Sequence, residues 1–331
     1  MKTNFIQFAC GPVHLHKRAI FSVLSLAAFY ELQPNERFII FTDQPDYYKK
    51  FLANIPVEYI RVTQNDLKSM MGNDDLIHRV KIAIIEKATQ LYPHHQIFYT
   101  DSDTFIISPL KPLLKQISPE VSLMHCFEFY MGNVPPDYSP KPITQDFSQM
   151  VKSNSFILNG EEITIPNADF SSWNAGLIGL HPTHFPLLKQ VYELTDQWYS
   201  KVRHHGAEQF AFSYILEKNT KIFLAEAYCY HYWYAIKKKI ADELLAEQIN
   251  EQFEKFNLEQ RIAWAKKLAQ KLPKLFQTHY YTLQNNMALA FQQGYYWQGY
   301  MKALQNLFRK PKHTIEILKD AGYYTKKLFI K

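Results

Sequence analysis

Alternation of strand-like and helix-like segments along the first 110 residues constrains the fold more than any other feature. Short apolar runs predict strands, and apolar residues spaced three and four positions apart predict helices. The predicted strands are residues 5–9, 37–41, 57–62 and the run after Gln96, and the predicted helices are 17–29, 46–52 and 76–91. Strands separated by helices indicate βαβ units and a mostly parallel sheet, in which ligands bind beyond the carboxyl ends of the strands.

The segments that follow extend this pattern. Residues 132–147 are rich in proline and polar residues and predict a long loop, while 156–160 predict a hairpin arm. Further strands are predicted over 174–180 and 222–232, and further helices over 187–199 and 207–216. From residue 240 onward the pattern is mostly helical, with breaks near Pro273, Gly294, Pro311 and Gly322. We therefore expect an α/β domain over residues 1–240 and a helical C-terminal region over residues 241–331.

Composition narrows the class of protein. A chain of 331 residues with 47% hydrophobic residues can bury a sizeable core. Its 10 glycines form none of the glycine-rich phosphate-binding motifs. Three widely spaced cysteines, Cys10, Cys126 and Cys229, predict free thiols rather than a disulfide framework. Free thiols are typical of the reducing cytosol, so we expect a cytoplasmic protein. The sequence has no run of 18 apolar residues, so we expect no membrane-spanning helix.

The net charge of +6 is unevenly distributed. Residues 1–240 carry 23 Lys and Arg against 23 Asp and Glu, whereas residues 241–331 carry 14 against 8. A basic helical region with aromatic residues is typical of peripheral contact with anionic lipid at the inner face of a membrane, and residues 261–272 are a candidate amphipathic stretch. The alternative is a solvated helical cap on the α/β domain. No nucleic-acid motif accompanies the charge, so we expect no nucleic-acid partner.

Two carboxylates, Asp101 and Asp103, follow the predicted strand that begins after Gln96. Because side chains alternate along an extended chain, residues two positions apart face the same way. Paired carboxylates form a hard oxygen site suited to Mn²⁺ or Mg²⁺, and such an ion can hold a nucleotide diphosphate. The alternative is that both aspartates cap a turn or the next helix.

Five segments in this order resemble the GT-A fold nucleotide-sugar glycosyltransferases, and more narrowly the retaining family of glycogenin and the bacterial lipooligosaccharide galactosyltransferases. The segments are His78-Arg79-Val80-Lys81, Tyr99-Thr100-Asp101-Ser102-Asp103-Thr104, Asn174-Ala175-Gly176, Glu208-Gln209, and His231 with Lys237 six residues on. Where the family has glycine between the last two, this chain has Tyr234. The resemblance covers residues 1–240 and implies a Rossmann-like mixed sheet with helices on both faces, followed here by a C-terminal helical extension.

The resemblance also implies roles for the matched residues. Asp101, Asp103 and His231 would hold Mn²⁺ or Mg²⁺. Gln209, Glu208 and Arg79 would act at the reacting sugar. The residues expected to line the donor site are Phe8, Ala9, Cys10, Asp43, Arg79, Lys81, Ser102, Asn174, Ala175, Gly176 and Lys237.

The implied activity is transfer of a hexose from a nucleotide diphosphate sugar, with a uridine diphosphate sugar as the first candidate, to a glycan or glycolipid acceptor. The match at Gln209 implies retention; in an inverting alternative Glu208 is the general base. A sugar-phosphate nucleotidyltransferase and a non-catalytic sugar- or lipid-binding module on the same fold stay open as alternatives.

Single residues also have purely structural alternatives. Arg79 would then form a salt bridge at a helix start, and Asp43 would cap a helix. His231 would belong to an aromatic cluster, and Lys237 to a solvated run of lysines.

Overall fold

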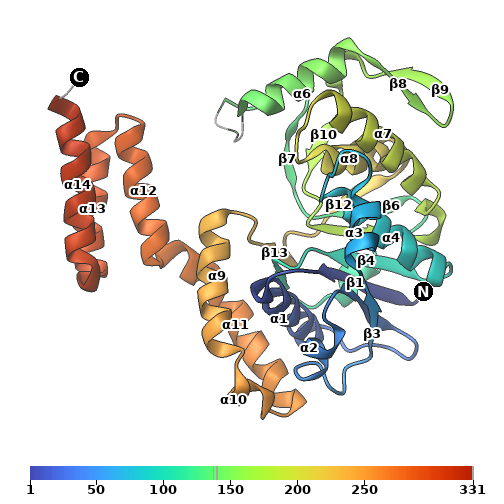
Figure 1. The fold of residues 1–331 in the computed structure, drawn as a ribbon, viewed down its shortest axis with the longest axis horizontal. Coiled ribbons are helices and arrows are strands. Elements are labelled where there is room, and N and C mark those ends of the chain that lie inside the picture. Colours follow the sequence, from blue (N-terminus) through green and yellow to red (C-terminus); the bar gives the residue numbers. More distant parts are fainter. Residues whose placement is uncertain (137, 139–140, 330–331) are drawn as a thin grey trace.

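A seven-stranded mixed sheet forms the centre of the computed structural model, which describes residues 1–136, 138 and 141–329 (Figure 1). The strand order is β12-β6-β11-β4-β1-β2-β3. Their bounds are β1 (Thr3–Ala9), β2 (Arg37–Thr42), β3 (Val57–Arg61), β4 (Gln96–Thr100), β6 (Val121–Met124), β11 (Leu177–Leu180) and β12 (Lys221–Leu224). Neighbouring strands pair in parallel except that β11 is antiparallel to both β4 and β6. The predicted α/β class with a mixed sheet is confirmed.

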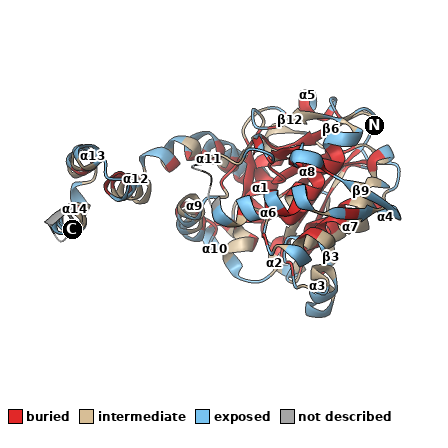
Figure 2. Cartoon of the chain, turned by 90° about the horizontal axis from the view of Figure 1, so that it is seen from above, coloured by how far each residue is buried: buried red, intermediate tan, exposed pale blue. Residues whose placement is uncertain are grey.

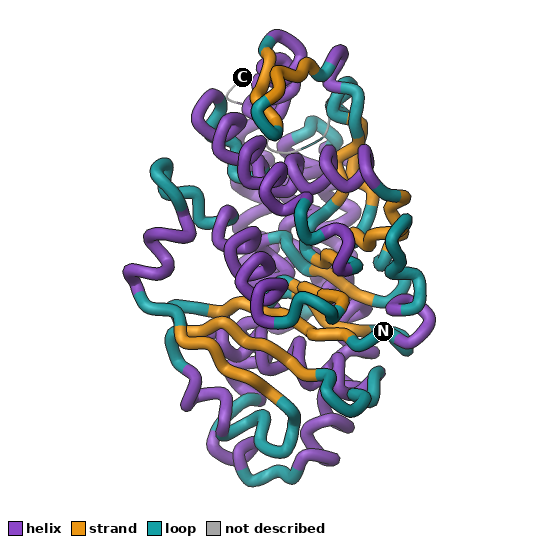
Figure 3. The backbone as a smooth tube through the Cα atoms, turned by 90° about the vertical axis from the view of Figure 1, so that its right-hand side faces the viewer, coloured by secondary structure: helices purple, strands orange, loops and turns teal. Residues whose placement is uncertain are grey.

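Alternating side chains of the central strands divide the core into two apolar clusters, one on each face of the sheet. In β1, for example, Phe5 points to one cluster and Ile6 to the other, and in β4 Phe98 and Ile97 divide in the same way. A strand that is apolar on both faces must be covered on both, as in other sheets built from βαβ units. Figure 3 shows the strands lying side by side between helices.

Helices cover both faces. One cluster contains side chains of α4 (Arg79–Leu91), α6 (Lys141–Ser153), α7 (Leu187–Lys201) and α8 (Ala207–Asn219). The other contains side chains of α1 (Val13–Phe29), α2 (Pro45–Lys49), α5 (Lys111–Leu114), α9 (Ala235–Gln248), α10 (Glu251–Glu254) and α11 (Leu258–Thr278). The core therefore continues beyond residue 240 through α9, α10 and α11.

Within the described residues, three further two-stranded pairs accompany the main sheet. These are β5 (Thr104–Ile106) with β13 (Cys229–His231), β7 (Phe127–Tyr130) with β10 (Ser171–Trp173), and β8 (Ser155–Leu158) with β9 (Glu161–Thr164). The predicted hairpin arm is the β8–β9 pair, whose turn residues Asn159 and Gly160 both have positive φ. Asn-Gly is the residue pair that such a tight turn favours.

Within the sheet domain, two predicted segments differ from the structure and one helix was not predicted. The predicted loop over 132–147 contains the start of α6, while residues 137, 139 and 140 lie outside the described residues. The predicted single strand over 222–232 is two strands, β12 at the edge of the main sheet and β13 on β5. A further helix, α3 (Gln64–Met71), has a Thr63–Asp66 capping box that marks its start.

The last helices form a separate small group that projects from the sheet domain (Figure 1). They are α12 (Tyr280–Gln292), α13 (Tyr296–Arg309) and α14 (Thr314–Phe329), and they share a small apolar cluster of their own. Most residues of these three helices are exposed or half-buried, whereas many residues of the sheet domain are buried (Figure 2). The predicted helical extension is thus confirmed, although α11 runs through Pro273 and α14 through Gly322 without the expected breaks. Among the described residues, no helix is long and apolar enough to span a bilayer.

Candidate active site

The candidate site lies at the carboxyl ends of the parallel strands β1, β2, β4 and β6, where the antiparallel strand β11 begins. Asp101 directly follows β4, and Asp103 directly precedes β5. His231 ends β13, which pairs with β5 so that His231 lies opposite Thr104. The pairing of β5 with β13 therefore brings together residues that are 128 or more positions apart in the sequence.

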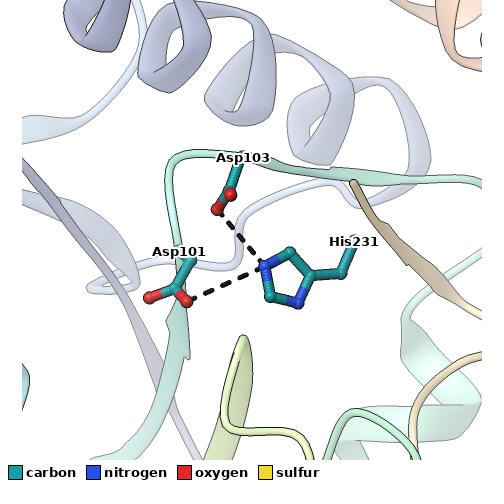
Figure 4. A group of neighbouring side chains, drawn as sticks. All are labelled: Asp101, Asp103 and His231. Carbon is teal, nitrogen blue, oxygen red and sulfur yellow. Dashed lines mark ion pairs between the residues drawn. The ribbon is translucent and has the colours of Figure 1, made fainter. Parts of the chain in front are cut away.

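Asp101, Asp103 and His231 converge on one point (Figure 4). One ligand atom from each lies within 4.8 Å of the others. His231 Nε2 is 3.3 Å from Asp103 Oδ1 and 3.9 Å from Asp101 Oδ2. Both Asp103 and His231 are buried, while Asp101 is half-buried. The three residues that the sequence assigned to a metal site are thus brought together.

The hydrogen bond to Asn174 shows that Nδ1 of His231 is the nitrogen that donates on that side of the ring. The Gly176 N–H donates to Asn174 Oδ1 at 3.0 Å, and Asn174 Nδ2 donates to Glu128 Oε1 at 3.0 Å, which fixes the orientation of the amide. Asn174 Oδ1 is therefore an acceptor, and His231 Nδ1, at 2.8 Å, must carry the proton. With Nδ1 protonated, Nε2 of the neutral ring can offer its lone pair to a cation bound between the two carboxylates.

Lys81 is a buried cation next to the Asp101 carboxylate. Its Nζ lies 3.4 Å from Asp101 Oδ2, 3.0 Å from Glu208 Oε1 and 3.0 Å from the Ala175 carbonyl oxygen. Burial lowers the pKa of Lys81, but Asp101 and Glu208 outweigh that effect and raise it above its usual value. Lys81 therefore stays charged and links Asp101 to Glu208.

Glu208 lies deeper than the sequence suggested. Its side chain is 2% exposed, and burial raises its pKa to about 7 although Lys81 opposes that change. Among the described residues, its ion-pair partner is Lys81. Glu208 is therefore connected to Asp101 only indirectly, through its ion pair with Lys81.

Asp103 is held by two positive or protonatable groups. Lys238 Nζ lies 2.7 Å from Asp103 Oδ2, on the oxygen that does not face His231. Burial raises the pKa of Asp103, but His231 and Lys238 together bring it well below its usual range. The sequence resemblance had placed Lys237, rather than Lys238, at the donor site. Lys237 Nζ instead lies over the rings of Tyr230 and Tyr234, at 5.1 and 5.2 Å from their centroids.

Asn174, Ala175 and Gly176 connect the parts of the site. Asn174 fixes His231, the Ala175 carbonyl accepts from Lys81, and the Gly176 carbonyl accepts from the Asp101 N–H at 2.9 Å. Gly176 also has no room for a side chain, since an added Cβ would lie 2.1 Å from His231 Nδ1.

Gln209 and Glu128 form the adjoining part of the site. Gln209 Oε1 accepts from the Ala175 N–H at 3.1 Å, and its Nε2 donates to Glu128 Oε2 at 2.8 Å. Glu128 also accepts from Ser172 Oγ at 2.9 Å. Glu128 could not be identified from the sequence, because its three donors, Ser172, Asn174 and Gln209, come from segments 44 to 81 positions away.

Arg79 is turned to other partners. Its Nε and Nη2 donate to Asp196 at 2.6 and 3.0 Å, and Nη1 donates to the Met70 carbonyl at 3.0 Å. Its guanidinium also lies 4.6 Å from the centroid of the Tyr192 ring. The structure therefore does not bring Arg79 to the aspartates, and the cation of α4 that reaches them is Lys81.

The ends of β1 and β2 meet beside the aspartates of β4 at the same sheet edge. Phe8 and Ala9 end β1, and the N–H of Gly11, after Cys10, donates to Asp43 Oδ2 at 3.2 Å. Burial and then Asp43 raise the pKa of Cys10 to about 12, so its thiol stays protonated. The completely buried His16, which the sequence did not single out, has Nε2 3.4 Å from Asp43 Oδ1. Ser102 lies in the turn between β4 and β5.

A hollow of about 630 Å³ lies elsewhere, lined by Thr3 and Gln96 among others. These residues begin β1 and β4, so the hollow is at the opposite edge of the sheet from the side chains described above.

Comparisons with known proteins give likenesses among solved structures. No family model and no curated protein matches the chain. The chain is similar to the galactosyltransferase LgtC in complex with donor and acceptor sugar analogs, with a TM-score of 0.46 and 11% identity over 76% of this chain and 98% of that chain. An active-site mutant of LgtC gives a TM-score of 0.45 and 12% identity over 76% of this chain and 98% of that chain.

Mouse xyloside xylosyltransferase 1 in its apo form gives a TM-score of 0.44 and 13% identity over 68% of this chain and 86% of that chain. These three solved structures are of glycosyltransferases.

Proposed function

We propose that this protein is a metal-dependent glycosyltransferase that moves a hexose from a nucleotide diphosphate sugar to a glycan or glycolipid. The observation that carries this proposal is the cluster of Asp101, Asp103 and His231, whose ligand atoms lie within 4.8 Å of one another. The bond from His231 Nδ1 to Asn174 leaves Nε2 free to act as a ligand. Two carboxylates and one imidazole suit Mn²⁺ or Mg²⁺.

The bound ion would neutralise the negative charge of the diphosphate leaving group. Lys238, beside Asp103, adds a positive charge for a phosphate at the same place. Lys81 and Asn174 keep the ligands in position, since each bonds to one of them. The ends of β1 and β2, with Cys10 and Asp43, lie at the same sheet edge, where the nucleoside of the donor would bind.

Transfer with retention is the stereochemistry that we favour. A general base must lie within hydrogen-bond reach of the acceptor hydroxyl, and Glu208 is buried and paired with Lys81. Gln209 is more accessible and is oriented by Glu128 and the Ala175 N–H, so its amide can stand against the reacting sugar. NMR of the product tests this point: an anomeric configuration opposite to that of the donor would exclude retention.

Hydrolysis of nucleotide sugars with Mn²⁺ tests the enzyme assignment. We expect one donor of a panel to be hydrolysed, and Asp103→Asn to lose at least about a hundredfold of this rate while staying folded. Asp46→Asn is the matched control, because Asp46 is an exposed aspartate on α2. Donor binding without turnover in the wild type would favour the binding module, and synthesis of a nucleotide sugar from a sugar phosphate would favour the nucleotidyltransferase.

The donor nucleotide and the cellular setting are further parts of the proposal. The sequence resemblance favours a uridine diphosphate sugar, and the same panel read by thermal shift identifies the nucleotide because a bound ligand raises apparent stability. We place the protein in the cytoplasm, with its basic C-terminal region in contact with an anionic membrane surface at the inner face.

A further inference from the structure

A stripe of large apolar side chains lies exposed along α13. Its members are Trp297, Met301, Leu304 and Phe308, with exposed fractions of 76, 39, 48 and 80%. Their spacing of four, three and four positions places them within an arc of about 60° on a helix that turns about 100° per residue. We call these four residues the α13 stripe. Four large apolar residues in one row on a soluble surface usually mark a binding surface.

The α13 stripe is not needed for the packing of its own helix. The buried residues of α13 are Gly299, Ala303 and Asn306, which lie on the other side of the helix and pack within the α12–α14 group. Gly299 has Phe291 of α12 directly against it. The helix thus has one apolar face for the fold and a second one that is free.

The net charge of the C-terminal helices indicates what could cover the stripe. Residues 280–331 carry 8 Lys and Arg against 2 Asp and Glu, whereas residues 1–279 carry 29 against 29. The whole net charge of the chain therefore lies in the α12–α14 group and the last residues. Two such surfaces would repel each other in a dimer, while an anionic surface would attract each of them.

Helix α14 has the same combination of side chains. Ile315 and Leu318 are 66 and 56% exposed, and the exposed Lys319 and Lys326 lie on the same side of the helix. Exposed apolar residues interleaved with lysines are the pattern of helices that lie in a bilayer interface.

We infer that the α13 stripe, with the exposed face of α14, docks on an anionic lipid bilayer. The inference deepens the proposed membrane contact and changes its location. The stretch 261–272, favoured by sequence alone, belongs to α11, whose apolar face is in the core with α1. Arg261 in that stretch is 5% exposed and donates to the Phe51 carbonyl oxygen at 2.8 Å. The surface available to lipid therefore lies on α13 and α14.

Vesicle binding by the full chain tests this inference. The probes are phosphatidylcholine vesicles with and without about 30% phosphatidylglycerol, sedimented at low and high salt. We expect binding to the anionic vesicles, weakening with salt, and an affinity for them reduced on the order of tenfold or more in Trp297→Ala/Phe308→Ala. Ile157→Ala is the matched control, because Ile157 is 50% exposed on the distant β8–β9 pair. It should bind as the wild type does.

Three outcomes would overturn the inference. They are equal binding to both vesicle types, unchanged binding by the double variant, or a dimer in light scattering that Phe308→Asp converts to a monomer. The last result would place a second copy on the stripe. A blue shift of tryptophan fluorescence on vesicle addition, lost in Trp297→Phe, would support insertion of Trp297. Donor hydrolysis without vesicles should be the same in the double variant and the wild type, so failure of the membrane inference is separable from failure of the proposed enzyme activity.

Discussion

Replacing Gly176 by alanine should disable the metal site through a single methyl group. The added Cβ would lie 2.1 Å from His231 Nδ1 and 2.2 Å from its Cε1. Since non-bonded heavy atoms prefer about 3.5 Å or more, the ring must move by more than about 1 Å. Ligand distances in a metal site tolerate about 0.2 Å. We therefore expect Mn²⁺ affinity to fall on the order of 10- to 100-fold, with a stability cost of about 1–3 kcal/mol.

Gly179→Ala is the matched control for this experiment. Gly179 lies in β11, the strand that begins directly after Gly176, and its Cβ would meet Leu123 side-chain atoms at 2.7 Å, away from His231. Both variants should lose stability in urea unfolding, but only Gly176→Ala should lose Mn²⁺ binding in calorimetry and Mn²⁺-dependent donor hydrolysis. Wild-type Mn²⁺ affinity in folded Gly176→Ala would refute the assignment of His231 as a ligand.

Three further predictions concern the ionisable groups of the site. In metal-free protein, the wild type should be more stable than Asp103→Asn, and this advantage should be complete above about pH 5 and decrease as pH falls below 3.8. The reason is that His231 and Lys238 lower the pKa of Asp103 in spite of its burial. Urea unfolding from about pH 3 to 7 measures the advantage, and an advantage that grows on acidification contradicts the prediction. Lys81→Met should abolish most donor hydrolysis, whereas Arg79→Ala should mainly cost about 1 kcal/mol of stability; the reverse result would restore the sequence-based role of Arg79. Chelation of the metal should stop hydrolysis reversibly and leave the far-ultraviolet circular dichroism unchanged, because two apolar clusters support the sheet without it; loss of the signal would show that the ion is structural.

Local sequence patterns were sufficient for most of the sheet domain. The strands β1, β2, β3 and β4 and the helices α1, α2 and α4 have the periodicity that their burial requires, whereas α3, which has no buried residue, was not predicted. The pattern failed where a strand is set by its partner. Residues 222–232 are mostly apolar and aromatic. Their local pattern therefore does not show that the chain pairs with β6 as β12 and then with β5 as β13.

The candidate site divides in the same way. Asp101 and Asp103 are identifiable because they follow a buried strand, and their convergence with His231 was available only through a resemblance. The choices between Arg79 and Lys81, and between Lys237 and Lys238, depend on side-chain directions. Helical neighbours at these spacings point differently, and their partners Asp196, Glu208 and Asp103 come from distant parts of the chain.

The antiparallel direction of β11 makes site assembly inseparable from strand alignment. Because β11 is antiparallel to its neighbours, the residues just before its start, rather than those after its end, lie beside the aspartates. There the Asn174 N–H donates to the Cys126 carbonyl and the Asp101 N–H donates to the Gly176 carbonyl. A slip of one residue along β4 would turn Asn174 away from His231 and reverse the faces of the whole strand. A partly folded chain in which β11 is unpaired therefore has no preformed cation site. In a refolding reaction, metal affinity should appear only when β11 has paired with β4 and β6.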